Sequence, residues 1–197
     1  MSNTKENIMK VSLRLFSEKG FDAVSVSMIA GELGITKGAL YRHYKSKRDI
    51  FDSILARMER GDASMAQSHG LQSENGMTPD VSPESFAGFT MDMFRYWTED
   101  EFASLFRRML VIEQYASLRM QSLYQQYLVS GPLEYTEDML REMGFDDCKE
   151  RAVRIYSAMY LYMSLMDGSS DRESVIESFE KILDQELKEG VLWKKRQ

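Results

Sequence analysis

Helical periodicity over almost the whole chain is the feature that most restricts the fold. Apolar residues recur at three- and four-residue spacing, and few stretches alternate apolar and polar residues as a half-buried strand would. The 197 residues include only three prolines, Pro79, Pro83 and Pro132, so long helices are seldom interrupted. The sequence therefore predicts an all-α protein, of a length that suits one large domain or two small ones.

The first fifty residues predict three short helices. Apolar residues at helical spacing share one face of the first helix. Ser25 or Ser27 can cap a second helix, and Thr36 can cap a third that runs to about Tyr44. Three helices of this size, joined by short connections, predict a small module at the N-terminal end of the chain.

The second and third of these helices carry the packing residues of a helix-turn-helix. Ile29 and Leu33 face inward, and Ala30 is small enough for the next helix to cross closely. Gly34 gives the backbone the freedom that the turn needs. The apolar residues that complete this small core are Ile35, Leu40 and Tyr44.

A longer fourth helix and a helical second block are expected downstream. Ser46 and Asp49 form a capping-box-like start to the fourth helix. The polar segment 68–83 predicts a long loop, and Gly131-Pro132 should break or kink the chain, with Pro132 opening a new helix. The helices of the second block are expected over residues 83–97, 100–115, 117–129, 132–143, 147–166 and 171–188.

Charge is distributed unevenly along the chain. The net charge is -6, yet residues 1–50 carry nine basic and five acidic side chains, which gives about +4 there and about -10 elsewhere. A basic end on an acidic body indicates a polyanion-binding module attached to a part that stays off the polyanion. Chance clustering is the alternative explanation for the charge alone.

The outward face of the third helix has residues suited to the major groove of DNA. Gly38 lets the backbone approach, and Arg42 on the same face can reach a guanine edge or a phosphate. Lys37 lies in the first turn, where recognition helices commonly touch bases. The full set of candidate DNA-contacting residues is Ser25, Ser27, Thr36, Lys37, Gly38, Ala39, Tyr41, Arg42, His43 and Lys47.

Within that set the expected roles differ. Lys37, Tyr41 and Arg42 are expected to read sequence, whereas Tyr41 and His43 can also donate to phosphate oxygens. Lys47 opens the fourth helix, where free N–H groups and the helix dipole favour an anion, and it is expected to contact phosphate.

The stretch "GFDAVSVSMIAGELGITKGALYRHYKSKRDIF" resembles the DNA-binding domain of the tetracycline-repressor (TetR) family of bacterial transcription regulators. Ser25 stands where threonine is common in that family, and Tyr44 stands where phenylalanine is more usual; both changes should preserve capping and packing. The similarity extends over residues 8 to about 55, on the elements Gly20-Phe21, Ser25-Val26, Ile29-Ala30, Gly34, Lys37-Gly38, Leu40-Tyr41, His43-Tyr44 and Ser46-Lys47.

The resemblance implies a DNA-binding domain at residues 1–46 and a helical effector-binding and dimerisation domain at residues 47–197. Members of the family are usually homodimers and usually repressors. We therefore expect a ligand-responsive repressor that binds a palindromic operator as a homodimer and is released by a small, largely apolar or aromatic effector.

Methionine and aromatic residues in the middle helices are candidates for lining an effector pocket. Methionine repacks easily and tyrosine offers a hydroxyl, which suits an adaptable, mostly apolar site. An ordinary hydrophobic core is the alternative for any one of them. The candidates are Met91, Phe94, Trp97, Phe106, Met109, Tyr115, Tyr124, Tyr127, Met159, Tyr162 and Met163.

The last two helices are candidates for a dimer interface. One carries a clear apolar stripe, and the other is apolar around most of its circumference, so both could pair with their symmetry mates as a four-helix bundle. The alternative is that both faces only close the core of the monomer. The candidate interface residues are Ile155, Met159, Tyr162, Val175, Phe179, Ile182 and Leu183.

The sequence disfavours two other functional classes. A small helical enzyme is disfavoured because the only histidines are His43 and His69, no HExxH, CxxC, P-loop or GxGxxG motif occurs, and Cys148 has no partner that marks it as a nucleophile. A helical interaction module that no longer binds DNA is disfavoured by the intact basic residues. We expect no catalytic residues, no cofactor, no metal site and no membrane span, and we expect residence in the bacterial cytoplasm.

Overall fold

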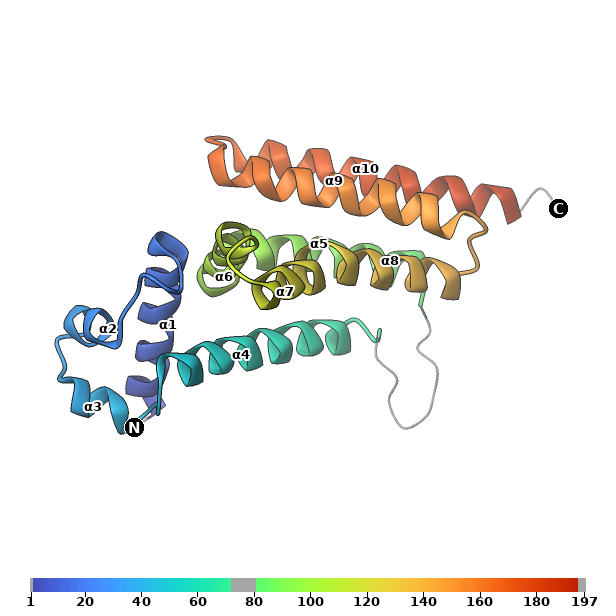
Figure 1. Ribbon diagram of the computed structural model, residues 1–197. Coiled ribbons are helices and arrows are strands. Elements are labelled where there is room, and N and C mark those ends of the chain that lie inside the picture. The colour runs from blue at the N-terminus through green and yellow to red at the C-terminus, as the bar shows by residue number, and fades with distance from the viewer. Residues whose placement is uncertain (1, 72–80, 195–197) are drawn as a thin grey trace. The chain divides into compact units, whose positions relative to one another are not determined.

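The computed structural model describes residues 2–71 and 81–194, with side chains described for 4–71 and 81–188. Within these residues the chain forms ten α-helices and no strand, as expected (Figure 1). They are α1 (Ser2–Lys19), α2 (Val26–Glu32), α3 (Lys37–Tyr41), α4 (Lys47–Ser68), α5 (Pro83–Glu99), α6 (Glu101–Glu113), α7 (Leu118–Leu128), α8 (Ser130–Glu142), α9 (Cys148–Gly168) and α10 (Arg172–Lys194). Of the predicted loop at 68–83, residues 72–80 lie outside the described residues.

The helices pack into two compact units. Unit 1 contains Met1–Asp62 and Asp100–Tyr124, and unit 2 contains Ala63–Glu99 and Gln125–Gln197. This division by packing differs from the boundary predicted between residues 46 and 47. The reason is non-local: α6 packs along α1, so a segment far downstream in sequence joins the N-terminal helices.

Side-chain caps fix where the helices of the N-terminal module begin. The Ser25 hydroxyl accepts a hydrogen bond from the Met28 N–H at 3.2 Å, so Ser25 and not Ser27 caps α2. Thr36 caps α3 by accepting from the Ala39 N–H at 3.1 Å. These bonds satisfy N–H groups that the first turn of a helix leaves without a partner.

The start of α4 is close to the expected capping box, except that the Asp49 carboxylate accepts from the residue before the cap. The Asp49 N–H donates to the Ser46 hydroxyl at 3.0 Å, while the Asp49 carboxylate accepts from the Lys45 N–H at 2.8 Å. Helix α3 is shorter than predicted and ends at Tyr41, although the Tyr44 N–H still reaches the Leu40 carbonyl at 3.1 Å. The chain therefore turns sharply between α3 and α4.

An aromatic cluster forms part of the core of unit 1. The Phe21 ring centroid lies 5.1 Å from that of Phe16 and 5.1 Å from that of Phe51, which joins the turn after α1 to the bodies of α1 and α4. Phe16 and Phe51 are almost completely buried. Tilted and edge-on contacts of this kind add to the stabilisation that burial alone provides.

Unit 2 is a helical layer structure built on α5, α8, α9 and α10. Helices α9 and α10 run side by side in opposite directions, and α9 also contacts α5 and α8 (Figure 1). The buried core cluster of this unit is Ala66, Leu71, Phe86, Phe89, Met139, Leu140, Ala152, Ile155, Leu183 and Leu187.

The chain bends sharply between α7 and α8, close to the predicted break. Pro132 lies in the first turn of α8 instead of opening it, and because it lacks an N–H the carbonyl of Leu128 loses its helical donor. The Tyr156 hydroxyl of α9 donates to that carbonyl at 2.8 Å. At Gly131 a Cβ would come within 2.0 Å of the Gln126 carbonyl oxygen, so the bend requires glycine there.

Among the described residues no helix combines the length and the apolar character that crossing a membrane requires.

Candidate nucleic-acid interface

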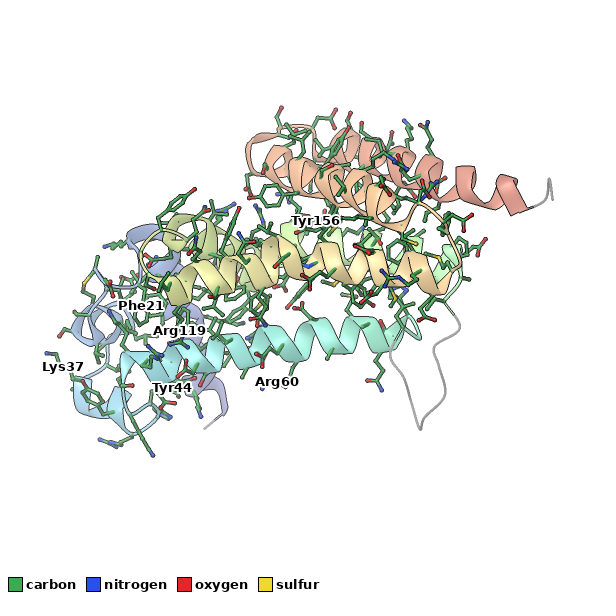
Figure 2. All side chains as sticks on the ribbon, turned by 45° about the vertical axis from the view of Figure 1, so that its right-hand side comes forward. Phe21, Lys37, Tyr44, Arg60, Arg119 and Tyr156 are labelled. Atoms are coloured by element: carbon green, nitrogen blue, oxygen red, sulfur yellow. The ribbon has the colours of Figure 1, made fainter. Side chains whose placement is uncertain are left out.

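Helix α3 presents the face that the sequence predicts. Leu40 and Tyr44 are buried, with 0% and 2% of their surface exposed, which anchors one side of the helix in unit 1. Lys37 and Gly38 lie on the exposed side, and Figure 2 shows Lys37 projecting outward. A Cβ at Gly38 would find only the Thr36 hydroxyl oxygen at 3.9 Å, so the surface beside this backbone is open.

The other candidate residues surround this face. Tyr41 is 49% exposed, and Arg42, which caps the C-terminal end of α3, is exposed as well. Ala39 and His43 are half-buried, so they can take part only through one side. The remaining members of the set, Ser25, Ser27 and Thr36, are exposed at the starts of α2 and α3.

Three cations of α3 and the turn after it are available to an anionic partner. Among the described residues Lys37, Arg42 and Lys45 have no ion-pair partner, whereas Lys10 and Arg14 of α1 are paired with glutamates. Unpaired surface cations can exchange their counterions for DNA phosphates without first breaking a salt bridge. Lys45 belongs to the basic cluster in the sequence but was not predicted as a DNA contact. Its lack of an ion-pair partner among the described residues depends on the tertiary structure.

Lys47 has a different environment from the one expected. Its Nζ donates to the Phe21 carbonyl at 2.6 Å and to the Asp22 carbonyl at 3.4 Å, and it lies 4.3 Å from the Phe21 ring centroid. An ammonium group has three N–H donors, so Lys47 can bond these carbonyls and a phosphate oxygen at the same time. The phosphate contact of Lys47 therefore stays a prediction.

The predicted pocket residues divide between the two units. In unit 1, Phe106 and Met109 are fully buried, Tyr124 is half-buried, and Tyr115 is 88% exposed. Tyr115 lies in the connection between α6 and α7, and its high exposure argues against a place in an interior pocket. Those in unit 2 are the buried Phe94, Trp97, Tyr127, Met159 and Met163 and the half-buried Met91 and Tyr162.

The structure brings some of these unit 2 residues together and adds one that was missed. The ring centroid of Phe179 lies 4.9 Å from that of Phe94 and 6.0 Å from that of Tyr162. The ring centroids of Trp97 and Tyr127 lie 6.4 Å apart. Tyr135 was not predicted, yet its hydroxyl oxygen is buried and has no hydrogen-bond partner among the described residues.

The predicted dimer interface is corrected at four residues. Ile155, Met159, Phe179 and Leu183 are 1%, 8%, 0% and 1% exposed, because they pack inside unit 2 of the same chain. The alternative, that these faces close the core of the monomer, holds for them. The remaining predicted interface residues, Tyr162, Val175 and Ile182, are half-buried.

A different side of α9 exposes three large apolar side chains among polar ones. Val153, Leu161 and Leu165 are 46%, 56% and 46% exposed and lie on the same side of the helix. Sequence periodicity could not separate this side from the buried one, because α9 is apolar around most of its circumference.

With this geometry established, the comparisons with known proteins identify the N-terminal module. The family model described as "Bacterial regulatory proteins, tetR family" matches residues 8–54. Residues 8–54 are a TetR-family helix-turn-helix domain. This segment is 55% identical over 50 residues to an uncharacterized HTH-type transcriptional regulator, YerO, of Bacillus subtilis (strain 168). The match covers 25% of this chain and only 17% of YerO, so it concerns the DNA-binding domain alone.

Solved structures extend the TetR likeness to most of the chain. A transcriptional regulator of the TerR/AcrR family from Aquifex aeolicus VF5 superposes with a TM-score of 0.72 at 18% identity, over 92% of this chain and 98% of that one. The SmeT–triclosan complex gives 0.69 at 21% identity, over 94% and 90%. At these identities the likeness shows that the chain has the all-helical fold of TetR-family regulators.

Proposed function

We propose that this chain is a sequence-specific DNA-binding transcription regulator. The observation that carries the proposal is the face of α3, where Lys37, Gly38 and Arg42 are exposed opposite the buried Leu40 and Tyr44. A short helix with a fixed inner side and an unpaired basic outer side suits the major groove of DNA. The TetR-family match over residues 8–54 supports the same role.

In this proposal Lys37, Tyr41 and Arg42 touch base edges, while Lys45 and Lys47 contact phosphates. Base contacts discriminate between sequences, whereas phosphate contacts set affinity and register. The protein acts as a homodimer that places one α3 in each of two successive major grooves, about 34–36 Å apart, on a near-palindromic operator.

The proposed dimer face is the exposed side of α9 that carries Val153, Leu161 and Leu165. These residues replace the four buried ones of the sequence-based prediction. Large apolar side chains exposed on one side of a helix typically mark an interaction surface, and a homodimer would cover this one by pairing the side with its symmetry mate.

The proposed effector is a small, mostly apolar molecule bound inside unit 2. The support is a core bordered by Met65, Met91 and Met93. The hydroxyl of Tyr135 beside this core has no hydrogen-bond partner among the described residues and can bond a polar atom of the effector. Triclosan in the SmeT complex is an instance of a small molecule bound by a protein of the same fold. Effector and operator would oppose each other's binding by equal free energies.

A selection from random duplex oligonucleotides tests this function. The purified protein is expected to enrich one near-palindromic motif, and the Lys37→Ala variant is expected to enrich a degenerate motif or none. Lys181→Ala is the matched control, because Lys181 is exposed on α10 of unit 2 and pairs with Glu177 one helical turn away. If the unmodified protein enriched no motif, the proposed function would be wrong.

A further inference from the structure

Two charged side chains from distant parts of the sequence hold the backbone of Phe21. Phe21 lies in the turn between α1 and α2 (Figure 2). The Phe21 N–H donates to Glu113 Oε1 at 3.0 Å, and the Phe21 carbonyl accepts from Lys47 Nζ at 2.6 Å. Glu113 is the last residue of α6 and Lys47 is the first of α4. A carboxylate thus bonds the Phe21 N–H and an ammonium group bonds the Phe21 carbonyl. We call this arrangement of Glu113, Phe21 and Lys47 the Phe21 clamp.

The carboxylate of this clamp occupies a closely fitted position. Glu113 is only 7% exposed, and a buried carboxylate is costly unless donors surround it. Gly20 makes room for it, because a Cβ there would lie 2.5 Å from Glu113 Oε1. Gly20 also has a φ of +82°, a conformation that favours glycine, so both the shape and the backbone of the turn suit this contact.

The ring of Phe21 fixes the same turn to the helices on either side. It packs on Phe16 of α1 and Phe51 of α4, and the Lys47 ammonium lies over it at 4.3 Å. Helix α2 begins at Val26, and α3 packs on α2. A rotation of the Phe21 peptide would therefore change where α2 and α3 are held and where Lys47 points.

We propose that Glu113 is a positioning residue for DNA recognition, through which the end of α6 sets the orientation of the helix-turn-helix. The proposal rests on the proposed function and adds how it is regulated. Helix α6 follows α5 of unit 2 directly in sequence, through the capping residue Asp100. A shift of α6 that withdraws the Glu113 carboxylate frees the Phe21 N–H, loosens the turn and releases Lys47 from its fixed partners.

Three substitutions of Glu113 separate this role from a general contribution to stability. Glu113→Gln keeps an acceptor oxygen at the same reach and is expected to bind the selected operator within about threefold of the unmodified protein. Glu113→Leu removes the acceptor, and Glu113→Asp keeps the charge but shortens the reach; both are expected to weaken operator binding about tenfold or more. Binding is measured by fluorescence anisotropy well below the unfolding temperature of each variant, so that all are folded.

Hydrogen exchange of the backbone gives a second readout. The Phe21 amide is expected to exchange faster in Glu113→Leu and Glu113→Asp than in the unmodified protein and in Glu113→Gln. Operator DNA is expected to slow this exchange in the unmodified protein, because coupling between two sites acts in both directions. If Glu113→Leu does not fold, Glu113→Asp carries the comparison alone.

The outcomes also separate the clamp from the function on which it rests. If the unmodified protein binds its operator and Glu113→Asp or Glu113→Leu binds equally well, the clamp is wrong while the function stands. Equal losses in Glu113→Gln and Glu113→Asp would likewise overturn the role of the acceptor atom. If no operator is bound at all, the proposed function fails, and the exchange rates of the Phe21 amide still decide whether the clamp exists.

Discussion

Asp62 is a half-buried residue of α4 whose carboxylate has an unusual environment. Its Oδ1 is buried and has no hydrogen-bond partner among the described residues. Burial raises the pKa of this carboxyl to about 7, and the charge of Glu59 contributes in the same direction. Because the folded-state pKa lies above the unfolded value of about 3.9, the folded protein holds this proton more tightly than the unfolded chain does.

The expected consequence is that Asp62 makes the protein less stable as the pH rises. Its unfavourable contribution is absent below about pH 4, grows between about pH 4 and pH 7, and is constant above, with an upper bound of about 4 kcal/mol. Asp62→Asn should therefore raise the free energy of unfolding more at pH 8 than at pH 5, as measured by urea denaturation. The exposed Asp184, paired with Lys188, provides the control Asp184→Asn. An equal effect of Asp62→Asn at both pH values would contradict the account.

Two tyrosines of unit 2 form a matched pair for testing hydroxyl groups. The Tyr135 hydroxyl oxygen is buried without a partner among the described residues, whereas the Tyr156 hydroxyl bonds the Leu128 carbonyl at 2.8 Å. Tyr135→Phe should be neutral or stabilise the protein by about 1 kcal/mol, and Tyr156→Phe should destabilise it by about 1–3 kcal/mol. The free energies of unfolding of both variants are measured by chemical denaturation without ligand. A larger loss in Tyr135→Phe than in Tyr156→Phe would contradict these assignments.

Much of the helical layout could be predicted from local signals. The caps at Thr36 and Ser46 and the bend at Gly131-Pro132 depend on residues close in sequence, and the structure contains all three. The packing of α6 on α1 could not be predicted, because it joins segments about ninety residues apart. For the same reason the role of Glu113 has no signal in the sequence.

The cap of α2 offers a test at the scale of the element. Ser25 accepts a hydrogen bond from the Met28 N–H, and Ser27 lies one residue inside the helix with no such role. Ser25→Ala should lower the free energy of unfolding by about 1 kcal/mol, whereas Ser27→Ala should change it by less than about 0.5 kcal/mol. Thermal unfolding of the DNA-free protein gives both values. If the Ser27 variant lost more stability, Ser25 could not be the cap.

Only part of the candidate site could be predicted from the sequence. The orientation of α3 followed from the helical wheel, because Leu40 and Tyr44 had to face inward. Whether the ammonium group of Lys45 or of Lys47 is bonded within the protein depends on residues distant in sequence, and no local pattern predicts it. The inner and outer sides of α9 were confused because both are apolar.

At the scale of the whole molecule, assembly is expected to depend on the exposed side of α9. Leu161 is 56% exposed there, and Leu161→Glu should convert the proposed homodimer to a monomer because it would place a charge in the proposed interface. Leu118 in unit 1 is 82% exposed, and Leu118→Glu is the control that should stay dimeric. Light scattering coupled to size-exclusion chromatography distinguishes the two. A dimeric Leu161→Glu variant would rule out this interface.

The distribution of charge is consistent with one DNA-contacting surface on an acidic molecule. A net charge of -6 is expected to keep most of the chain off nucleic acid, while the cations of α3 and its following turn, which have no ion-pair partner among the described residues, stay available to phosphates. Binding should therefore weaken steeply with added salt, since each phosphate contact releases counterions.

The central claim is that the outer face of α3 reads DNA sequence, and a competition titration tests it most directly. The selected operator and a scrambled duplex of equal length compete for the unmodified protein and for Lys37→Ala and Arg42→Ala at one fixed salt concentration. Each substitution should cost about 1–3 kcal/mol of operator binding and reduce the preference for operator over scrambled DNA. A preference that is unchanged in both variants would show that α3 does not read sequence.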